Sequence, residues 1–382
     1  MTNASIQLPE PTGFFNVGTT TYHWIDTKRK EMHADNAEHP YRELMVQVWY
    51  PAQQSTGKKA DYMPPRVHNY IQDIVKKATA TTWQGVGYIT QNVATNSYKD
   101  VPIASENNTY PVIIFSHGFA SINYVHTSFC EELASHGYIV IAPNHTYIAD
   151  PVEFADGRII GLADSFKTVQ PGSQQFDKAM YNEIDVWIDD IKFILDELEK
   201  INNHDAKNIL THRLNVSAIG MVGHSFGGMT AHQVCSLDTR IKAGVDMDGA
   251  LYGNLNRDVL IPFMYMYVEP QMLSKQELEM WHMQEEDYVK FIQDMRANIT
   301  KLSASLKGDA YIIKFIQGDH MTFSDYLLLK HVSKPTMLNP LRGIEITRAL
   351  LVDFFDKYLK GETAKVLNAG MVTYPEITIE RK

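Results

Sequence analysis

The chain has 382 residues, of which 44% are hydrophobic and 21% charged, an ordinary composition for a globular protein with a large core. Its formal net charge is −10 and no run of Lys or Arg stands out. This excludes nucleic acid as a partner, because phosphate binding needs a concentrated positive surface. No uncharged segment approaches the roughly 18 apolar residues that a membrane span needs.

The N-terminal segment, MTNASIQLPEPTG, has neither the basic start nor the apolar core of a signal peptide. This favours a cytoplasmic protein, although a chain whose leader had been removed would look the same. The two cysteines, Cys130 and Cys235, each lie in a helix-like segment among apolar neighbours. We therefore expect two buried free thiols rather than a disulfide. The sequence carries no signal for an oligomeric state.

Short apolar segments alternate with helical patterns along the chain, which is typical of a mostly parallel sheet. The first expected strand alternates apolar and polar residues, as an edge or antiparallel strand does, and several later ones are apolar on both faces, as central parallel strands are. The expected strands are 44–50, 111–117, 138–144, 216–223, 242–248, 262–268 and 310–316. We predict a single α/β domain over residues 1–382, with a doubly wound, mostly parallel sheet.

Two helices are expected to pack on this sheet. Apolar residues from Ile184 to Leu198 recur at i, i+3, i+4 and i+7, the spacing of a helix with one buried face. A closing helix is expected over about 340–359, with a proline near its start and Gly361 just past its end.

Two segments, about 54–106 and 270–308, do not fit the alternation and are interpreted as insertions. The first carries a short helical pattern near 67–76 and scattered aromatics such as Trp83. The second opens with the capping-box pattern SKQE at Ser274 and continues with apolar residues at helical spacing. We favour a helix pair packed on its own domain, because an amphipathic stripe is more often core than membrane contact. The alternative is a lid whose Met, Trp and Phe side chains make transient contact with lipid.

The segment GHSFG, Gly223 to Gly227, fits the pattern G-x-S-x-G that places a serine nucleophile on the turn between a strand and a helix in α/β-hydrolases. A strand pattern precedes it and a helical pattern follows it. The glycines remove Cβ atoms where the turn brings strand and helix together. The context therefore indicates that Ser225 is a nucleophile rather than a structural turn residue.

A serine nucleophile needs a histidine base and a carboxylate that orients the base. In α/β-hydrolases the acid follows the nucleophile and the histidine comes last. The strand after the serine ends with Asp246 and Asp248, and Asp248 is favoured because it lies nearer the carboxyl edge, where ligands bind. His320 follows the last expected strand. His282 lies in the second insertion and His331 lies further past the strand, so neither is favoured.

The oxyanion formed during acyl transfer needs two backbone N–H donors. Phe226, directly after the serine, is expected to supply one. The other is expected from Phe119, in a loop that follows the strand ending at FSHG. Ser116 and His117 are interpreted as residues that shape this loop by hydrogen bonding.

The ordered segments FSHGFAS, GHSFGG, KAGVDMDGA and GDHMTFSDY resemble the platelet-activating-factor acetylhydrolase family, the plasma-type enzymes and their bacterial relatives. The opening segments LPEPTGFFNVGTTTYHWID and ELMVQVWYPA are similar to that family's first strands, and PNHTYIADPVEFADGR is similar to the stretch after its next strand. The resemblance covers about 8–358 outside the two insertions. It implies an α/β-hydrolase fold and calcium-independent serine phospholipase activity without metal or cofactor.

Matching the family's motifs assigns Ser225 as nucleophile, Asp248 rather than Asp246 as acid, His320 as base, and Phe119 and Phe226 as oxyanion donors. Family members carry a bulky residue soon after the acid, where this chain has Gly249 and Ala250. That difference predicts a wider pocket beside the acid.

The sequence thus predicts a serine carboxylester hydrolase that cleaves small short-acyl esters or phospholipids with a short or oxidised acyl chain. A lipase, thioesterase, acyltransferase or peptidase is compatible with the same three residues. A binding protein on the hydrolase fold without turnover is the least favoured alternative, because such proteins typically lose one of the three.

Overall fold

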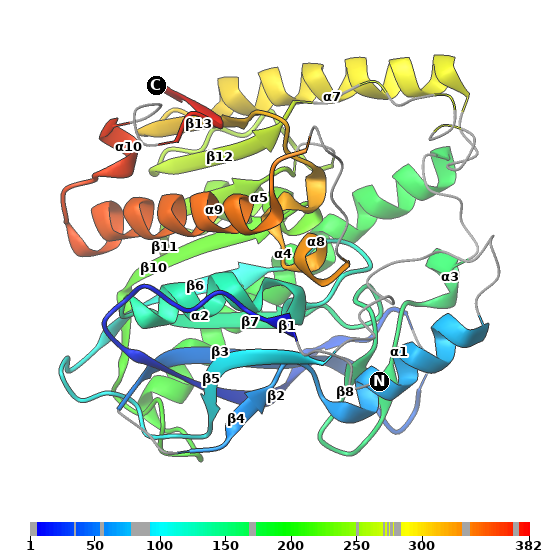
Figure 1. The fold of residues 1–382 in the computed structure, drawn as a ribbon. Helices are drawn as coiled ribbons and strands as arrows, with labels where there is room; N and C mark the ends of the chain where they lie inside the picture. The colour runs from blue at the N-terminus through cyan, green and yellow to red at the C-terminus, as the bar shows by residue number, and fades with distance from the viewer. Residues whose placement is uncertain are drawn as a thin grey trace.

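The computed structural model describes most of the chain. The described residues are 6–33, 36–53, 57–77, 92–167, 173–249, 252–269, 272, 275, 278, 284–330, 337–369 and 374–382. Among them, twelve strands form one sheet in the order β1-β5-β2-β3-β7-β6-β10-β11-β12-β13-β14, with β4 paired to β5 (Figure 1). A separate two-stranded sheet consists of β8 and β9.

The centre of the sheet is parallel. From β7 to β13, each strand pairs in parallel with its neighbour, whereas β3 is antiparallel to both β2 and β7, and β14 is antiparallel to β13. The strands of this part are β3 (Tyr41–Ala52), β7 (Ile139–Asn144), β6 (Tyr110–Ser116), β10 (Leu214–His224), β11 (Ile241–Met247), β12 (Phe263–Val268), β13 (Ala310–Phe315) and β14 (Ile377–Arg381). All seven strands predicted from the sequence are confirmed.

The N-terminal edge of the sheet contains strands that apolar runs do not reveal. The long strand β2 pairs with β3 on one side and with β5 on the other, and its sequence, NVGTTTYHWIDTKRK, is mostly polar because one face is solvated. The strands here are β1 (Ile6–Gln7), β2 (Asn16–Lys30), β4 (Lys59–Asp61) and β5 (Val93–Lys99). The separate two-stranded sheet consists of β8 (Val152–Glu153) and β9 (Ile159–Ile160).

Helices cover both faces of the sheet. On one face α2 and α9 lie side by side and pack on Ile113 and Phe115 of β6 (Figure 1). On the other face α4 and α5 pack on Val112 and Ile114 of the same strand, as the two-residue side-chain period of a strand requires. The helices are α1 (Pro65–Lys77), α2 (Thr127–Ser135), α3 (Asp164–Lys167), α4 (Gln174–Asn203), α5 (Phe226–Leu237), α7 (Glu285–Ser305), α8 (Tyr326–Lys330), α9 (Pro340–Phe355) and α10 (Val366–Ala369).

Three short turns of other helix types complete the described structure. Two are 3₁₀ helices, η1 (Asn123–His126) and η2 (His320–Phe323). The third is a π turn, η3 (Asp356–Lys360), which ends at Gly361 with φ 76°. The predicted closing helix is therefore α9 plus this turn, and a proline at its first turn and a glycine after its end limit it as expected.

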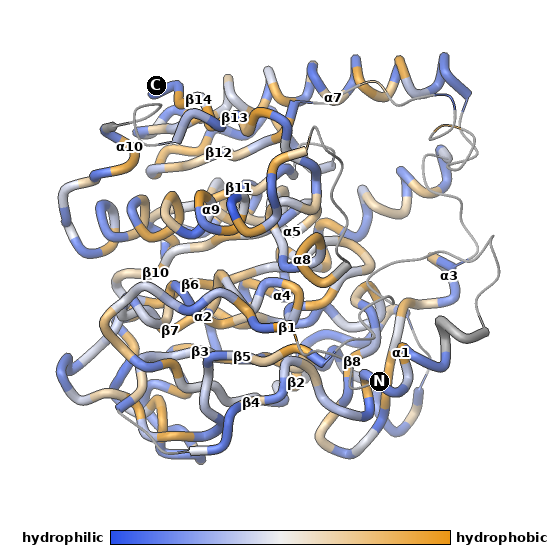
Figure 2. The backbone as a smooth tube through the Cα atoms, viewed as in Figure 1, coloured by the Kyte–Doolittle hydropathy of each residue, from blue (hydrophilic) through white to orange (hydrophobic). Residues whose placement is uncertain are grey.

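The two predicted insertions differ in how they join the sheet. In the first, α1 confirms the helical pattern near 67–76, and β5 is built into the main sheet between β1 and β2. In the second, α7 is buried only at Ile292, Leu302 and Ser305, and Figure 2 shows hydrophilic and hydrophobic residues alternating along it. Trp83 and Ser274 lie outside the described residues.

Both cysteines are buried free thiols, as predicted. Cys130 of α2 lies in the core on the α2–α9 face, and Cys235 of α5 lies in the core on the α4–α5 face. No helix among the described residues is long and apolar enough to cross a bilayer.

Candidate active site

Ser225 lies on the turn between β10 and α5, in a backbone conformation that residues other than glycine rarely adopt. Its φ is 58° and its ψ is −123°, and its N–H donates to the carbonyl of Met247 on the neighbouring strand (2.8 Å). Such a conformation costs of order 1–3 kcal/mol and persists only where the surroundings enforce it. The turn therefore holds the serine side chain out at the carboxyl edge of the sheet.

Glycines make this turn possible by removing side chains where backbones meet. A Cβ at Gly223 would stand 2.0 Å from the carbonyl oxygen of Gly227, and a Cβ at Gly227 would stand 2.3 Å from the carbonyl oxygens of Ser116 and His117. No real Cβ approaches another atom so closely, so both positions exclude every other residue. The glycines of the pattern thus have the close-packing role that the sequence predicted.

His320 bridges Ser225 and Asp248. Its Nδ1 lies 2.7 Å from Asp248 Oδ2 and its Nε2 lies 3.0 Å from Ser225 Oγ. The three residues follow β10, β11 and β13, whose parallel alignment brings their carboxyl ends to one edge. With Nδ1–H donated to the Asp248 carboxylate, Nε2 is left to accept the serine O–H. The structure thus brings these three predicted residues together.

Asp248 and Asp246 have separate positions. The N–H of Asp248 donates to the carbonyl of Met266 (2.7 Å), and its Oδ1 accepts from the N–H of Val268 (3.1 Å), so the carboxylate is fixed toward His320. Asp246 is fully buried, and its Oδ1 accepts from the N–H of Gly249 (2.8 Å). Burial raises the pKa of Asp246 well above the usual range of a carboxyl group. Its environment favours a neutral acid beneath the turn rather than a partner of the histidine.

The pKa of His320 is raised above its ordinary value. Burial lowers this pKa, but the hydrogen bond and the negative charge of Asp248 outweigh burial, with a further contribution from the charge of Asp319. The His320 side chain is 46% exposed, so a substrate or water molecule can reach it. A raised pKa and access to solvent are properties that suit a general base.

A second histidine, His224, holds the loop that carries His320. The Nε2 of His224 lies 2.9 Å from the carbonyl oxygen of His320, and its Nδ1 lies 3.3 Å from Nε2 of the buried His126. The rings of His224 and His320 are 4.7 Å apart. The turn itself is capped by Asp319, whose side chain accepts from the N–H of Met321. His224 is the first of the two variable positions of the G-x-S-x-G pattern, so the pattern does not single it out.

The two predicted oxyanion donors belong to segments that meet at Ser225. Phe226 is the first residue of α5, where backbone N–H groups have no acceptor within the helix. Gly118 lies against the serine, since a Cβ built on it would stand 3.1 Å from the Ser225 Cβ. Phe119 follows and packs its half-buried ring on Phe166 and Phe176.

Comparison with known proteins gives the family. A family model described as platelet-activating factor acetylhydrolase, isoform II, matches residues 1–149 and 186–365, which is most of the chain. The chain belongs to the platelet-activating factor acetylhydrolase family. It is thus a carboxylic ester hydrolase, as its sequence predicts. A second model, described as chlorophyllase, matches residues 77–248.

Individual relatives of this acetylhydrolase-family chain are distant. A probable 1-alkyl-2-acetylglycerophosphocholine esterase of Arthroderma benhamiae is 25% identical over 98% of this chain and 94% of its own length. A platelet-activating factor acetylhydrolase of Cavia porcellus is 25% identical over 53% of this chain, which spans about half the length of that relative (49%). Chlorophyllase-1 of Arabidopsis thaliana is 30% identical over 33% of this chain and 29% of its own length.

The fold has a close counterpart among solved structures. A ferulic acid esterase from Streptomyces cinnamoneus superposes with a TM-score of 0.76 over 98% of this chain and 99% of its own, at 23% identity. At this identity the likeness shows the fold alone. Together with the mostly parallel sheet it confirms the predicted α/β-hydrolase architecture of this acetylhydrolase-family chain.

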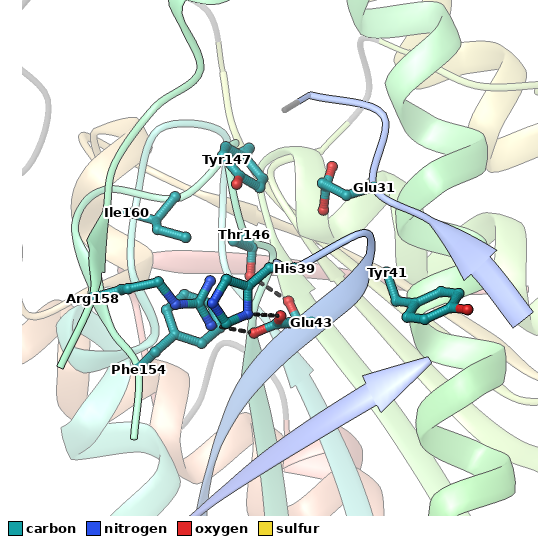
Figure 3. Close-up of a pocket in the computed structure, with 9 residues that line it drawn as sticks. All are labelled: Glu31, His39, Tyr41, Glu43, Thr146, Tyr147, Phe154, Arg158 and Ile160. Carbon is teal, nitrogen blue, oxygen red and sulfur yellow. Dashed lines mark hydrogen bonds and ion pairs between the residues drawn. The ribbon is translucent and has the colours of Figure 1, made fainter. Parts of the chain in front are cut away.

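One pocket of the described structure lies apart from Ser225, Asp248 and His320. Figure 3 shows Glu43 at its centre, with His39 and Arg158 directed toward the carboxylate. Ser225, Asp248 and His320 do not line it. The lining residues are Glu31, His39, Tyr41, Glu43, Thr146, Tyr147, Phe154, Arg158 and Ile160.

The remaining sequence predictions concern two other histidines, the residues directly after Asp248, and metal binding. His282, His331 and Ala250 lie outside the described residues. Gly249 is buried against the turn, and a Cβ there would stand 2.2 Å from the carbonyl oxygen of Ser225. The glycine is therefore required by the packing of the turn, while the wider pocket stays a prediction. Within the described part of the chain, no group of three or more His, Cys, Asp or Glu residues could hold a metal ion.

Proposed function

We propose that this protein hydrolyses short-acyl carboxylic esters through an acyl-enzyme on Ser225, with His320 as general base and Asp248 as its orienting acid. The observation that carries this proposal is the position of His320, 3.0 Å from the serine oxygen and 2.7 Å from the carboxylate. The backbone N–H groups of Phe119 and Phe226 are the proposed oxyanion donors.

In the proposed reaction, Ser225 Oγ attacks the acyl carbonyl carbon while His320 Nε2 takes the serine proton. The carbonyl oxygen becomes an oxyanion, stabilised by the two N–H groups and by the positive end of α5. The tetrahedral intermediate collapses as His320 passes the proton to the leaving alcohol, which leaves the acyl group on Ser225. Water then repeats the sequence, releasing the acid and restoring the serine.

The proposed substrate class follows from the relatives. The relative from Arthroderma benhamiae carries the name of an acetyl phospholipid esterase and covers nearly this whole chain. A phospholipid with a short or oxidised acyl chain is therefore the leading substrate, with small water-soluble esters as the alternative within the same chemistry. A thioester or peptide substrate, or an alcohol in place of water as acceptor, uses the same residues and is tested beside them.

We infer that the chain forms one domain over residues 1–382 and that α7, within the segment 270–308, packs on it. Leu302 of α7 belongs to the core shared with α4 and α5, and Ser305 Oγ lies 2.8 Å from Nε2 of the buried His232. The N-terminal half of α7 is mostly exposed. A role for this half as a lipid-contacting lid predicts a preference for long acyl chains.

The test is hydrolysis of p-nitrophenyl esters from acetate to palmitate, with an acetyl phospholipid, methyl ferulate, a thioester and a peptide beside them. Serine-dependent activity that falls steeply beyond about four carbons supports the short-acyl proposal. A maximum at long chains supports a lipase with a lid. Activity retained in Ser225→Ala, which keeps the fold but removes the nucleophile, contradicts the proposed mechanism.

A further inference from the structure

A second Ser–His–Asp chain lies behind the proposed oxyanion loop. Ser116 Oγ is 2.9 Å from His145 Nε2, and His145 Nδ1 is 2.8 Å from Asp190 Oδ2. The contacts are of the same type as those at Ser225, His320 and Asp248. All three residues are fully buried, however, so neither substrate nor water can reach the serine. This second chain therefore cannot act as a nucleophile system and calls for another role.

Its acid is held by two arginines. Arg42 donates to both oxygens of Asp190 (Nε to Oδ1, 3.0 Å; Nη2 to Oδ2, 2.7 Å), and Arg29 Nη2 adds a third contact (2.8 Å). Burial raises the pKa of Asp190, but the charge of Arg42 and the hydrogen bonds of His145 and Arg42 outweigh burial and leave this pKa well below its usual range. The carboxylate is thus a permanent, fixed acceptor for His145.

His145 fixes the loop at two successive residues. Burial lowers its pKa, so the ring is neutral, with Nδ1–H donated to Asp190 and Nε2 accepting the O–H of Ser116. The backbone N–H of His145 donates to Nε2 of His117 (3.1 Å). That contact leaves Nδ1 of His117 as the protonated nitrogen, and it lies 2.7 Å from the carbonyl oxygen of Gly118.

The last contact sets the direction of the proposed oxyanion donor. The carbonyl of Gly118 and the N–H of Phe119 belong to one planar, trans peptide group, so they point in opposite directions. The Gly118 carbonyl is held by His117 and also accepts from the N–H of Ser121 (3.3 Å). Holding this carbonyl therefore fixes the orientation of the Phe119 N–H group.

Trp187 of α4 connects the two oxyanion segments. Its ring stacks on His145 (3.7 Å, interplanar angle 13°) and meets the edges of His117 (5.1 Å) and Phe226 (4.8 Å). Trp187 and Asp190 are three residues apart, so both project from the same face of α4. One helix face thus supports the loop before Phe119 and the ring of Phe226.

We propose that Ser116, His145 and Asp190 form a positioning triad that holds the loop Ser116–Phe119 so that the Phe119 N–H stabilises the oxyanion on Ser225. The inference rests on the proposed serine mechanism. The triad touches neither substrate nor the reacting atoms, so its loss lowers the stabilisation of the transition state and leaves ground-state binding unchanged.

The test uses Ser116→Ala and His145→Asn in the full chain. Ser116→Ala removes only the terminal O–H, and His145→Asn keeps a donor for Asp190 while cutting the contact with Ser116. Asp190→Asn is unsuitable as the main variant, because it leaves Arg42 without its carboxylate. Ser135→Ala is the matched control, since Ser135 is an equally buried serine at the end of α2. Its partners Gly13 and Phe15 lie by Tyr110 at the start of β6, at the opposite end of that strand from Ser116.

Each variant is titrated for active sites with a p-nitrophenyl phosphonate, and kcat, KM and inhibitor affinities are then measured. We expect kcat per active site to fall roughly tenfold in both variants with KM nearly unchanged. The inhibition constant of a short-chain alkyl trifluoromethyl ketone, which forms an oxyanion on the serine, should rise in parallel. The affinity of the matching non-electrophilic alcohol should not change. The double variant should be no worse than the single ones.

The proposal is overturned if Ser116→Ala keeps both kcat per active site and ketone affinity within about twofold of the parent. It is also overturned if the losses in the two single variants multiply in the double variant, because the two substitutions cut one link. These outcomes are distinct from a failure of the proposed function. That failure appears as activity in Ser225→Ala, whatever the Ser116 variants do.

Discussion

The described part of the structure contains two Ser–His–Asp groups with nearly equal hydrogen-bond distances and opposite environments. In one, Ser225 stands on a strained turn and His320 is 46% exposed. In the other, Ser116 ends an ordinary strand, and its histidine and aspartate are sealed from solvent. The comparison teaches that hydrogen-bond geometry alone does not make a nucleophile. Exposure, backbone conformation and the charges around the acid decide which Ser–His–Asp group is suited to catalysis and which is suited to holding a loop in place.

The two histidines show this difference in their pKa shifts. Asp248 raises the pKa of His320 against the effect of burial, so this ring is prepared to take up a proton. Burial dominates at His145 and lowers its pKa, although Asp190 opposes it. The positive charges of Arg42 and Arg29 further disfavour a charged His145. The same His–Asp pair thus suits proton transfer at one site, while at the other it holds a neutral ring in place.

The largest expected effect separates the two serines. Ser225→Ala or His320→Ala should lower kcat/KM by roughly 10⁴-fold or more, because the proposed nucleophile or its proposed base is lost while the fold remains. Ester hydrolysis beside circular dichroism of the purified variants measures this. If kcat/KM fell by the same factor in Ser225→Ala as in Ser116→Ala, the distinction between the two Ser–His–Asp groups would be contradicted.

The next effect separates the two neighbouring acids. Asp248→Asn should lower kcat by roughly 10³- to 10⁴-fold, since the histidine loses its orienting carboxylate. Asp246→Asn should cost far less, because Asp246 already favours the neutral form beneath the turn. Steady-state kinetics of the two variants, which make the same Asp-to-Asn replacement two residues apart, provide the measurement. A larger loss in Asp246→Asn would mean that the acid has been wrongly assigned.

The pH dependence should follow the exposed histidine alone. His320 must be neutral to accept the serine proton, and its pKa is raised above its ordinary value. The rate kcat/KM should therefore rise with pH through that raised pKa and fall about tenfold per unit below it. Ser116→Ala should keep this acid limb in place, since His145 stays neutral. An acid limb that moves in Ser116→Ala would indicate that the two chains titrate together.

The smallest effect concerns the backbone. At Ser225, φ is 58°, so glycine should be more stable than alanine by about 1 kcal/mol. At Ser116, within a strand of ordinary φ, alanine should be more stable than glycine by about 1 kcal/mol. Urea unfolding of the four variants gives both differences. Equal signs at the two positions would contradict a strained turn confined to Ser225.

Much of the site could be predicted from sequence because its signals are local. Ser225 lies in a five-residue pattern with a strand before it, and Asp248 and His320 each follow a strand in the expected order. The sequence indicates a loop-shaping role for Ser116, but its partners His145 and Asp190 could not be predicted, because they come from distant segments without a shared pattern. Their contact depends on the packing of α4 against β6 and the loop after β7.

In the fold, too, the elements with local sequence signals could be predicted and those that depend on distant contacts could not. The strands with apolar runs, such as β6 and β10, were predicted from their own residues. The residues of β2 are largely polar and half solvated, so only the family resemblance pointed to a strand there. The pairing of β5 between β1 and β2 depends on partners far away in sequence, so the sequence alone indicates an insertion there.

The two buried cysteines lie on opposite faces of the sheet, Cys130 under α2 and α9 and Cys235 under α4 and α5. Their reactivity can therefore show which helical layer separates from the sheet first. Burial raises the thiol pKa of both Cys130 and Cys235, so neither is a reactive thiolate in the closed protein. An alkylating reagent should therefore modify neither cysteine until the protein opens. Mass spectrometry after timed alkylation distinguishes the two peptides. Exposure of Cys235 before Cys130 would record separation of the α4–α5 layer from the sheet, and the reverse order would record release of α2 and α9.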